Sequence, residues 1–141
     1  MRHVRFLADG RVHRGRWDAE GIRDEAGRVR PAEAITWLPP VAPSKILGFA
    51  LTYADHATEL GVSRPDELAL FFKPPSALIG HRAPVIYPDG VEYLHYEAEL
   101  AVVIGRRCRR VRPEQARDVI KGYTVANDVT VRDFIRNFYR P

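Results

Sequence analysis

Two glutamates open an otherwise apolar stretch of the chain, the segment YEAELAVVIG from Tyr96 to Gly105. Residues two apart in a β-strand point to the same face, so Glu97 and Glu99 would lie close together. Two ionised carboxylates on a partly buried face repel each other and lose hydration. The pattern therefore indicates a compensating proton, arginine or cation, or else an edge strand whose glutamates are in solvent.

A third acid, Asp128, lies at the end of the segment YTVAND, which the pattern predicts to be a strand. Three carboxylates without a cysteine partner suit a hard divalent cation such as Mg²⁺, which prefers oxygen ligands and keeps positions open for substrate oxygens. This hypothesis requires Glu99 and Asp128 to converge in space. The alternative is that Asp128 forms a turn or caps a helix.

The segment DHATE places His56 three residues before Glu59. On a helix these side chains share a face, and a histidine oriented by a carboxylate can act as a base. An incidental pair on a surface helix is the alternative. The other histidines have no comparable neighbours in the sequence; they are His3, His13, His81 and His95.

Short strands and helices must position these residues. The pattern predicts a strand over 46–51, a helix over 53–60 that ends at Gly61, and strands on both sides of a turn at Asp89-Gly90. It also predicts a helix from Pro113 to the residue before Gly122, and a turn at Asn127-Asp128 after another strand. Several mixed strands and few helices predict an α+β fold with a dominant sheet.

Residues 1–42 predict a small N-terminal β module and a linker. The segment HVRFLADGRVHRGRW alternates around the turn dipeptide Asp9-Gly10, and EGIRDEAGRVR adds short strands and turns. The segment WLPPVAPSK has three prolines, which suits an extended linker. We therefore expect a domain boundary that separates residues 1–42 from residues 43–141.

Composition narrows the class of protein. The chain has 141 residues, 45% of them apolar, and a net charge of +4. The arginine-rich segment GRRCRRVR could be a solvated turn or a phosphate-binding patch, but no aromatic residue interleaves with it, which argues against nucleic acid. One cysteine excludes an internal disulfide. Without an 18-residue apolar run or a signal-peptide core, the sequence predicts a soluble cytoplasmic protein with no membrane partner.

Four segments taken together resemble the fumarylacetoacetate hydrolase (FAH) family. They are TYADHATELG, FFKPPSALIG, YEAELAVVIG and GYTVANDVTVRD, and the resemblance covers residues 45–141. It implies the mixed β-sheet roll or barrel of that family's catalytic fold, preceded here by the small β module, and a homodimer. Family members continue well past the match, with a catalytic lysine in that further part. We therefore expect residues 43–141 to be the N-terminal portion of the catalytic domain and the chain to be incomplete.

The resemblance implies three sets of site residues. The ligands of Mg²⁺, for which Mn²⁺ is an alternative, are Glu97, Glu99 and Asp128. The catalytic pair is His56 and Glu59. The substrate-binding residues are Arg132, Tyr139 and Lys73.

Within the family, VEYLHYEAELAVVIG and RDFIRNFYRP are most similar to decarboxylase/isomerases of aromatic-compound catabolism. Ile135 stands where the hydrolases usually have a glutamine, and it cannot hydrogen-bond an attacking water. The resemblance thus implies a Mg²⁺-dependent decarboxylase/isomerase of 2-oxo (2-hydroxy-diene) dicarboxylates that works through a metal-chelated enolate. An acylpyruvate hydrolase or oxaloacetate decarboxylase of the same family is the alternative, followed by a non-catalytic half-fold binding module.

Overall fold

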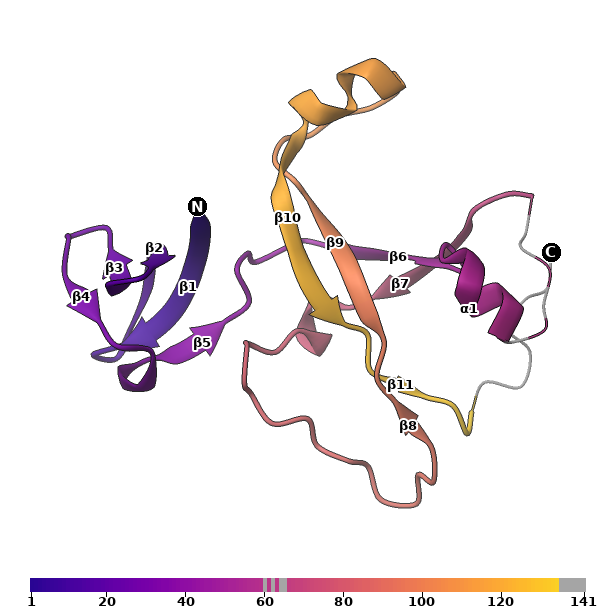
Figure 1. The fold of residues 1–141 in the computed structure, drawn as a ribbon, viewed down its shortest axis with the longest axis horizontal. Coiled ribbons are helices and arrows are strands. Elements are labelled where there is room, and N and C mark those ends of the chain that lie inside the picture. The colour runs from indigo at the N-terminus through magenta and orange to yellow at the C-terminus, as the bar shows by residue number, and fades with distance from the viewer. Residues whose placement is uncertain (60, 62, 64–65, 135–141) are drawn as a thin grey trace. The chain divides into compact units, whose positions relative to one another are not determined.

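The computed structural model describes residues 1–59, 61, 63 and 66–134 (Figure 1). The chain forms two compact units, Met1–Val85 and Ile86–Pro141. Strands predominate and helices are few and short, which agrees with the predicted strand-rich α+β class. Every ladder among the described residues is antiparallel, and none of their sheets closes into a barrel. Within the same residues no helix combines the length and apolarity that a membrane crossing needs.

The first unit begins with a five-stranded sheet. Its strands are β1 (Arg2–Ala8), β2 (Arg11–Asp18), β3 (Gly21–Asp24), β4 (Val29–Arg30) and β5 (Thr36–Leu38), in the spatial order β4-β3-β2-β1-β5. The predicted turn at Asp9-Gly10 is confirmed: their φ angles of 50° and 70° lie in the left-handed region that a type I′ hairpin turn needs. This sheet is the predicted small β module, whereas the boundary after residue 42 stays a prediction.

A small core lies against this sheet. Phe6 of β1 and Ile22 of β3 are fully buried, and Ala8 completes the cluster. Partly buried apolar side chains pack around it; they are Val4, Trp17, Ala32, Ile35 and Trp37. Two of these belong to the connection after β4, which contains the 3-10 helix η1 (Ala32–Ala34). Burial of each large side chain contributes about 1.5–3 kcal/mol, so the sheet has a core of its own.

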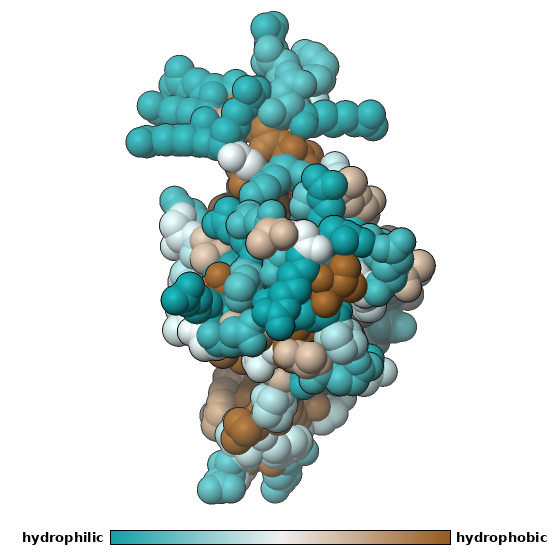
Figure 2. All heavy atoms as spheres, turned by 90° about the vertical axis from the view of Figure 1, so that its left-hand side faces the viewer, coloured by the Kyte–Doolittle hydropathy of each residue, from teal (hydrophilic) through white to brown (hydrophobic). Residues whose placement is uncertain are grey.

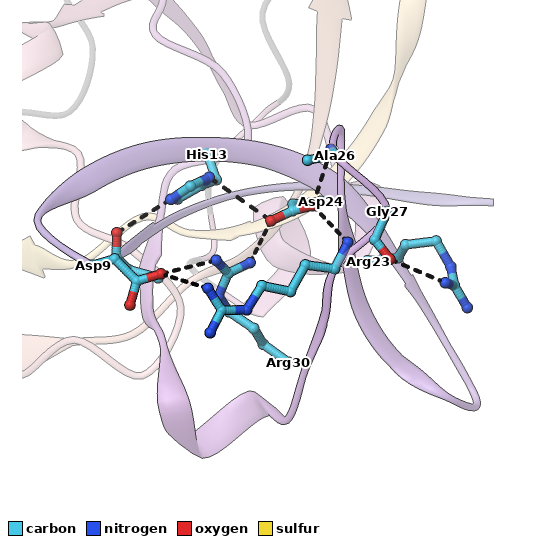
Figure 3. Close-up of polar contacts among 9 residues, drawn as sticks. Asp9, His13, Arg23, Asp24, Ala26, Gly27 and Arg30 are labelled. Carbon is cyan, nitrogen blue, oxygen red and sulfur yellow. Dashed lines mark hydrogen bonds and ion pairs between the residues drawn. The ribbon is translucent and has the colours of Figure 1, made fainter.

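Charged side chains join the turns of this sheet (Figure 3). The buried Arg30 guanidinium donates to Asp24 and, at 3.0 Å, to Asp9, which also pairs with Arg28 at 3.3 Å. The Nδ1 atom of His13 lies 4.0 Å from the Asp24 carboxylate. The hydrogen bonds from Arg30 lower the pKa of the Asp24 and Asp9 carboxyls, although partial burial opposes this. Both acids are therefore ionised at neutral pH and offset the buried charge of Arg30.

The rest of the first unit is a strand pair with a short helix. Strand β6 (Ile46–Ala50) pairs with β7 (Ala69–Lys73), and α1 (Ala54–Glu59) lies between them in sequence. The helix ends as predicted, because Gly61 has a φ of 64° and its N–H donates to the Thr58 carbonyl at 3.0 Å. Pro74 ends β7, and the 3-10 helix η2 (Pro75–Ala77) follows.

The second unit is built on a two-stranded ribbon (Figure 1). Strand β9 (Ala98–Ile104) pairs with β10 (Ile120–Asn127), and β8 (Leu94–His95) pairs with β11 (Thr130–Val131). The 3-10 helix η3 (Pro113–Asp118) lies in the connection between β9 and β10. One face of β9 and β10 exposes large apolar side chains, namely Leu100, Val102, Ile104, Tyr123 and Val125. This set is called the apolar face below.

Three local predictions from the sequence are wrong. The strand predicted before the Asp89-Gly90 turn does not form, because Pro84 and Pro88 lack the N–H group that a ladder needs. The helix that begins at Pro113 is a 3-10 helix that ends at Asp118, because Ile120 already pairs with β9. Asn127-Asp128 is not a turn, since the backbone there stays hydrogen-bonded to the opposite strand.

Candidate active site

The predicted metal ligands lie where the two ladders of the ribbon meet. On one side of this junction Ala98 is opposite Asn127, and on the other side His95 is opposite Thr130. Both pairings follow the same register, so the ribbon continues through the junction without a slip. An unchanged register keeps the side chains of each strand on their own faces.

Glu97 and Asp128 are opposite each other at this junction. The Asp128 N–H donates to the Glu97 carbonyl at 2.8 Å. The Glu97 N–H donates to the Oδ1 atom of Asn127 at 3.0 Å, so a side chain replaces one ladder bond. The hydroxyl of Thr130 donates to the Asp128 carbonyl at 3.1 Å. Local side chains thereby fix the backbone of both acids.

One face of the ribbon carries the predicted metal ligands and is called the site face. Because alternate residues of a strand share a face, it consists of Tyr93, His95, Glu97 and Glu99 on one strand and of Ala126, Asp128, Thr130 and Arg132 on the other. Glu97 and Glu99 are half-buried, whereas Ala98 and Leu100 beside them are exposed. The structure therefore brings the two glutamates onto one partly buried face, as the sequence predicts, and adds Asp128 to it.

Arg132 runs along the site face toward the acids. Its N–H donates to the Tyr93 carbonyl at 2.9 Å, which places it beyond Thr130 on the same strand. Its Nη2 atom donates to Oε1 of Glu97 and lies 3.5 Å from Nδ1 of His95. The Arg132 and Glu97 side chains are only 13% and 22% exposed, so this ion pair is largely withdrawn from water.

Asp133 clamps the backbone next to Arg132. Its two carboxylate oxygens accept hydrogen bonds from the N–H groups of Glu92 and Tyr93, both at 3.0 Å. These bonds, the one from Glu92 first, lower the pKa of the Asp133 carboxyl, so it is ionised at neutral pH. The Tyr87 hydroxyl donates to the Glu92 carbonyl at 3.1 Å and extends the clamp. Asp133 thus fixes the strand end from which Arg132 projects.

Sequence reasoning missed His95, Asn127 and Asp133. The spacing of the sequence could have identified His95. It lies two residues before Glu97, and Glu99 lies two residues after Glu97, so all three share one face of a strand. Asn127 resembled a turn residue, and only its bond to the opposite strand reveals its role. Asp133 acts on backbone groups about 40 residues away in sequence, which no local pattern predicts.

The other predicted site residues belong to the first unit or lie outside the description. His56 and Glu59 are both in α1, and Lys73 ends β7. Tyr139 lies outside the described residues. The roles of these four residues therefore stay predictions.

The three carboxylates have the donor type that a hard divalent cation prefers, because all of them offer oxygen atoms on one face. The Oδ1 atom of Asp128 is buried, as a ligand atom turned away from solvent would be. Among the described residues, however, no three His, Cys, Asp or Glu side chains are gathered closely enough to enclose an ion. The Glu97 carboxylate is turned to Arg132 instead. The complete ligand set stays a prediction.

Residues 45–141 match the family model described as fumarylacetoacetate (FAA) hydrolase C-terminal. An uncharacterized protein of Archaeoglobus fulgidus is 46% identical over 130 residues, which cover 92% of this chain and 52% of the relative. The 4-hydroxyphenylacetate degradation bifunctional isomerase/decarboxylase of Salmonella dublin is 43% identical over 109 residues, which cover 77% of this chain and 25% of that protein. The chain therefore spans about half or less of the length of these relatives.

Two solved structures resemble this chain in both fold and sequence. The 5-carboxymethyl-2-hydroxymuconate delta-isomerase of Mycobacterium smegmatis matches with a TM-score of 0.82 and 34% identity, over 96% of this chain and 57% of that one. The 2-hydroxyhepta-2,4-diene-1,7-dioate isomerase of Mycobacterium marinum matches with a TM-score of 0.79 and 30% identity, over 96% and 56%. The predicted family fold is therefore confirmed.

Proposed function

Because the chain belongs to the fumarylacetoacetate hydrolase family, we propose that it contributes the metal-binding site of an isomerase/decarboxylase of 2-oxo dicarboxylates. Two relatives support this substrate class, because they are named as isomerases of 2-hydroxyhepta-2,4-diene-1,7-dioate and of 5-carboxymethyl-2-hydroxymuconate. The observation that carries the proposal is the site face, where Glu97, Glu99 and Asp128 share one partly buried surface with Arg132. The enzyme is further proposed to be a homodimer.

Glu97, Glu99 and Asp128 would hold one divalent ion, Mg²⁺ or Mn²⁺. When bound, such an ion supplies positive charge that stabilises negative charge developing on a substrate oxygen. The backbone contacts of Asn127 and Thr130 support this role, because they hold the Glu97 and Asp128 backbones in place before any ligand arrives.

The chain's other site residues would bind the substrate and move protons. Arg132 suits a carboxylate of a dicarboxylate substrate, because a guanidinium matches two carboxylate oxygens in a fork. Lys73 and Tyr139 are proposed as further substrate contacts. In decarboxylation the bond to the departing CO₂ breaks, and its electron pair remains on the substrate as an enolate that then takes a proton. His56, oriented by Glu59, would move that proton, and would do so along the diene in isomerisation.

The proposed reaction can be tested with the purified full-length gene product. We expect turnover of 2-hydroxy-diene and 2-oxo dicarboxylates with Mg²⁺, and its loss when EDTA removes the metal. Glu99→Gln should lower turnover at least about 100-fold, as loss of a group that supports the charged transition state does. The matched control is Glu114→Gln on the exposed helix η3, which should leave the rate unchanged.

Two results would contradict the proposal. Full activity of Glu99→Gln would remove the metal assignment from the site face. Turnover confined to acylpyruvates would replace the isomerase/decarboxylase with a hydrolase of the same family.

A further inference from the structure

One end of the site face is held together by a single carboxylate. The two carboxylate oxygens of Asp133 accept hydrogen bonds from the N–H groups of Glu92 and Tyr93, each at 3.0 Å. In the opposite direction, the Arg132 N–H donates to the Tyr93 carbonyl at 2.9 Å. These three hydrogen bonds join residues 92–93 to residues 132–133 and are called the Asp133 clamp below.

The ladder next to the Asp133 clamp is short. Strand β8 pairs with β11 through only two residues on each strand. Backbone hydrogen bonds that are exposed to solvent open more readily than buried ones. Glu92 and Tyr93 are both exposed, so water competes for their N–H groups. An ionised carboxylate binds an N–H group more strongly than a neutral acceptor does. Asp133 therefore keeps this end of the ribbon closed.

The guanidinium of Arg132 reaches from the closed end to the opposite strand. Its Nη2 atom donates to Oε1 of Glu97 and lies 3.5 Å from Nδ1 of His95. Both of these residues follow Tyr93 on the same strand, so the reach of Arg132 to them depends on the pairing of its backbone with Tyr93. Opening of the clamped end would therefore move the guanidinium on the site face.

We propose that Asp133 is a positioning residue that makes the site selective for substrates with a second carboxylate. This inference rests on the proposed function, in which Arg132 binds a carboxylate of a 2-oxo dicarboxylate. Such a substrate has one carboxylate beside its 2-oxo group and a second one at the far end of its chain. Arg132 belongs to the end of the site face and binds the far carboxylate.

The selectivity follows from the geometry of this kind of contact. A guanidinium binds a carboxylate most strongly when its planar fork faces both oxygens, which requires a fixed orientation. The Asp133 clamp fixes the backbone from which the fork projects. Asp133 acts through Arg132 and not on the substrate, because its two oxygens are already bound to backbone N–H groups.

A matched pair of ligands tests the selectivity of the full-length protein. 2-Oxoadipate and 2-oxohexanoate have carbon chains of equal length, and only 2-oxoadipate has a second carboxylate. Calorimetry in a buffer with Mg²⁺ gives both dissociation constants, and their quotient is the selectivity ratio. The wild type should bind 2-oxoadipate about tenfold more tightly or better, as a hydrogen bond between charged groups provides. A wild type that does not prefer 2-oxoadipate would contradict the inference.

Asp133→Asn keeps the shape of the side chain but loses the charge and one of the two acceptor oxygens. We expect the selectivity ratio to fall several-fold, and KM for the dicarboxylate substrate to rise while kcat changes less. Tyr87→Phe removes only the hydrogen bond to the Glu92 carbonyl and should lower the ratio less. The matched control is Asp118→Asn, an exposed acid in η3, which should leave the ratio unchanged.

The ratio separates positioning from a purely structural role. A loss of folded protein lowers the amount of ligand bound, but it does not change the quotient of two dissociation constants measured on the same variant. An unchanged ratio in Asp133→Asn would therefore overturn the inference, because the carboxylate would then support the fold alone.

Arg132→Met separates this inference from the proposed function. If Arg132→Met loses the selectivity while Asp133→Asn keeps it, only the positioning role of Asp133 is wrong. If Arg132→Met keeps the selectivity, Arg132 does not bind the second carboxylate, and its proposed role in substrate binding fails as well. Adding Asp133→Asn to Arg132→Met should change the ratio no further, because Asp133 acts through Arg132. A further fall would contradict that order of action.

Discussion

The sheet of residues 2–38 and the ribbon of β9 and β10 use similar alternating strands in different ways. In the sheet, β1 has a neighbour on each side, and its inward side chain Phe6 is fully buried. In the ribbon each strand has one neighbour, and the apolar face is exposed, with Val125 at 80%. On the part of the surface drawn in Figure 2, hydrophobic side chains likewise reach the outside between hydrophilic ones.

The difference shows that an alternating strand pattern does not by itself produce a buried core. A two-stranded ribbon is at best marginally stable in water without a further apolar surface. A contiguous exposed apolar face of this kind is typical of surfaces that pack against other protein. The sheet has a buried core of its own, whereas the ribbon carries the candidate site on one face and exposed apolar side chains on the other.

Phe6→Ala should give the largest effect. Removal of a fully buried aromatic side chain leaves a cavity, so the free energy of unfolding of the sheet should fall by about 3–5 kcal/mol. Urea denaturation followed by the fluorescence of Trp17 and Trp37, both within this unit, measures it. Leu7→Ala, on the exposed side of the same strand, is the control and should cost less than about 1 kcal/mol. Equal losses would mean that the sheet has no one-sided core.

Asp24→Asn should have a smaller effect that depends on pH. The pKa of Asp24 is lower in the fold than its ordinary value of 3.8, mainly because Arg30 donates to it. Its ionised form therefore stabilises the fold above about pH 3.8, and this contribution is lost as the pH falls through the lower folded pKa. Denaturation midpoints should show the variant destabilised at pH 7, with the difference narrowing below pH 3.8.

The control for this experiment is Asp118→Asn, an exposed acid in η3 of the other unit. It should leave the midpoint unchanged across the same pH range. A difference between wild type and Asp24→Asn that stays constant down to pH 3 would contradict the electrostatic account of the turn cluster.

Val125→Thr should have the smallest effect. The substitution keeps the β-branched shape and exchanges a methyl group for a hydroxyl. Because Val125 is exposed, the free energy of unfolding should change by less than about 0.5 kcal/mol. Val103→Thr, on the half-buried face of the same ribbon, should cost more, about 1 kcal/mol or above. Native-state hydrogen exchange of the β9 and β10 amides measures both. A larger loss for Val125→Thr would show that the apolar face is packed in solution.

Local turn chemistry explains where the sequence predicted the fold well. The hairpin at Asp9-Gly10 and the end of α1 at Gly61 were predicted because residues with positive φ determine both. The helix from Pro113 was predicted too long, because Ile120 already pairs with Ile104 of β9 and the chain is in a strand from there on. Strand pairing is decided by distant partners, and a single local pattern does not contain them.

The same distinction holds for the site. Glu97 and Glu99 were predicted to share a face from their spacing of two residues, and the structure agrees. The ion pair of Glu97 with Arg132 joins residues 35 apart, and the Asn127 contact joins residues 30 apart. The sequence predicted that a positive charge or a proton compensates the glutamates, but it could not tell an arginine side chain from a metal ion.

The unbroken register at the junction of the two ladders has a consequence for how this segment can change its length. Every site residue of one strand has an odd number, from Tyr93 to Glu99, and every one opposite has an even number, from Ala126 to Arg132. Loss of a single residue between His95 and Glu97 would exchange the two faces and place the acids among the apolar side chains. Loss or gain of two residues would preserve the parity. Natural variation in chain length here should therefore occur in steps of two, which sequence comparison across the family can examine.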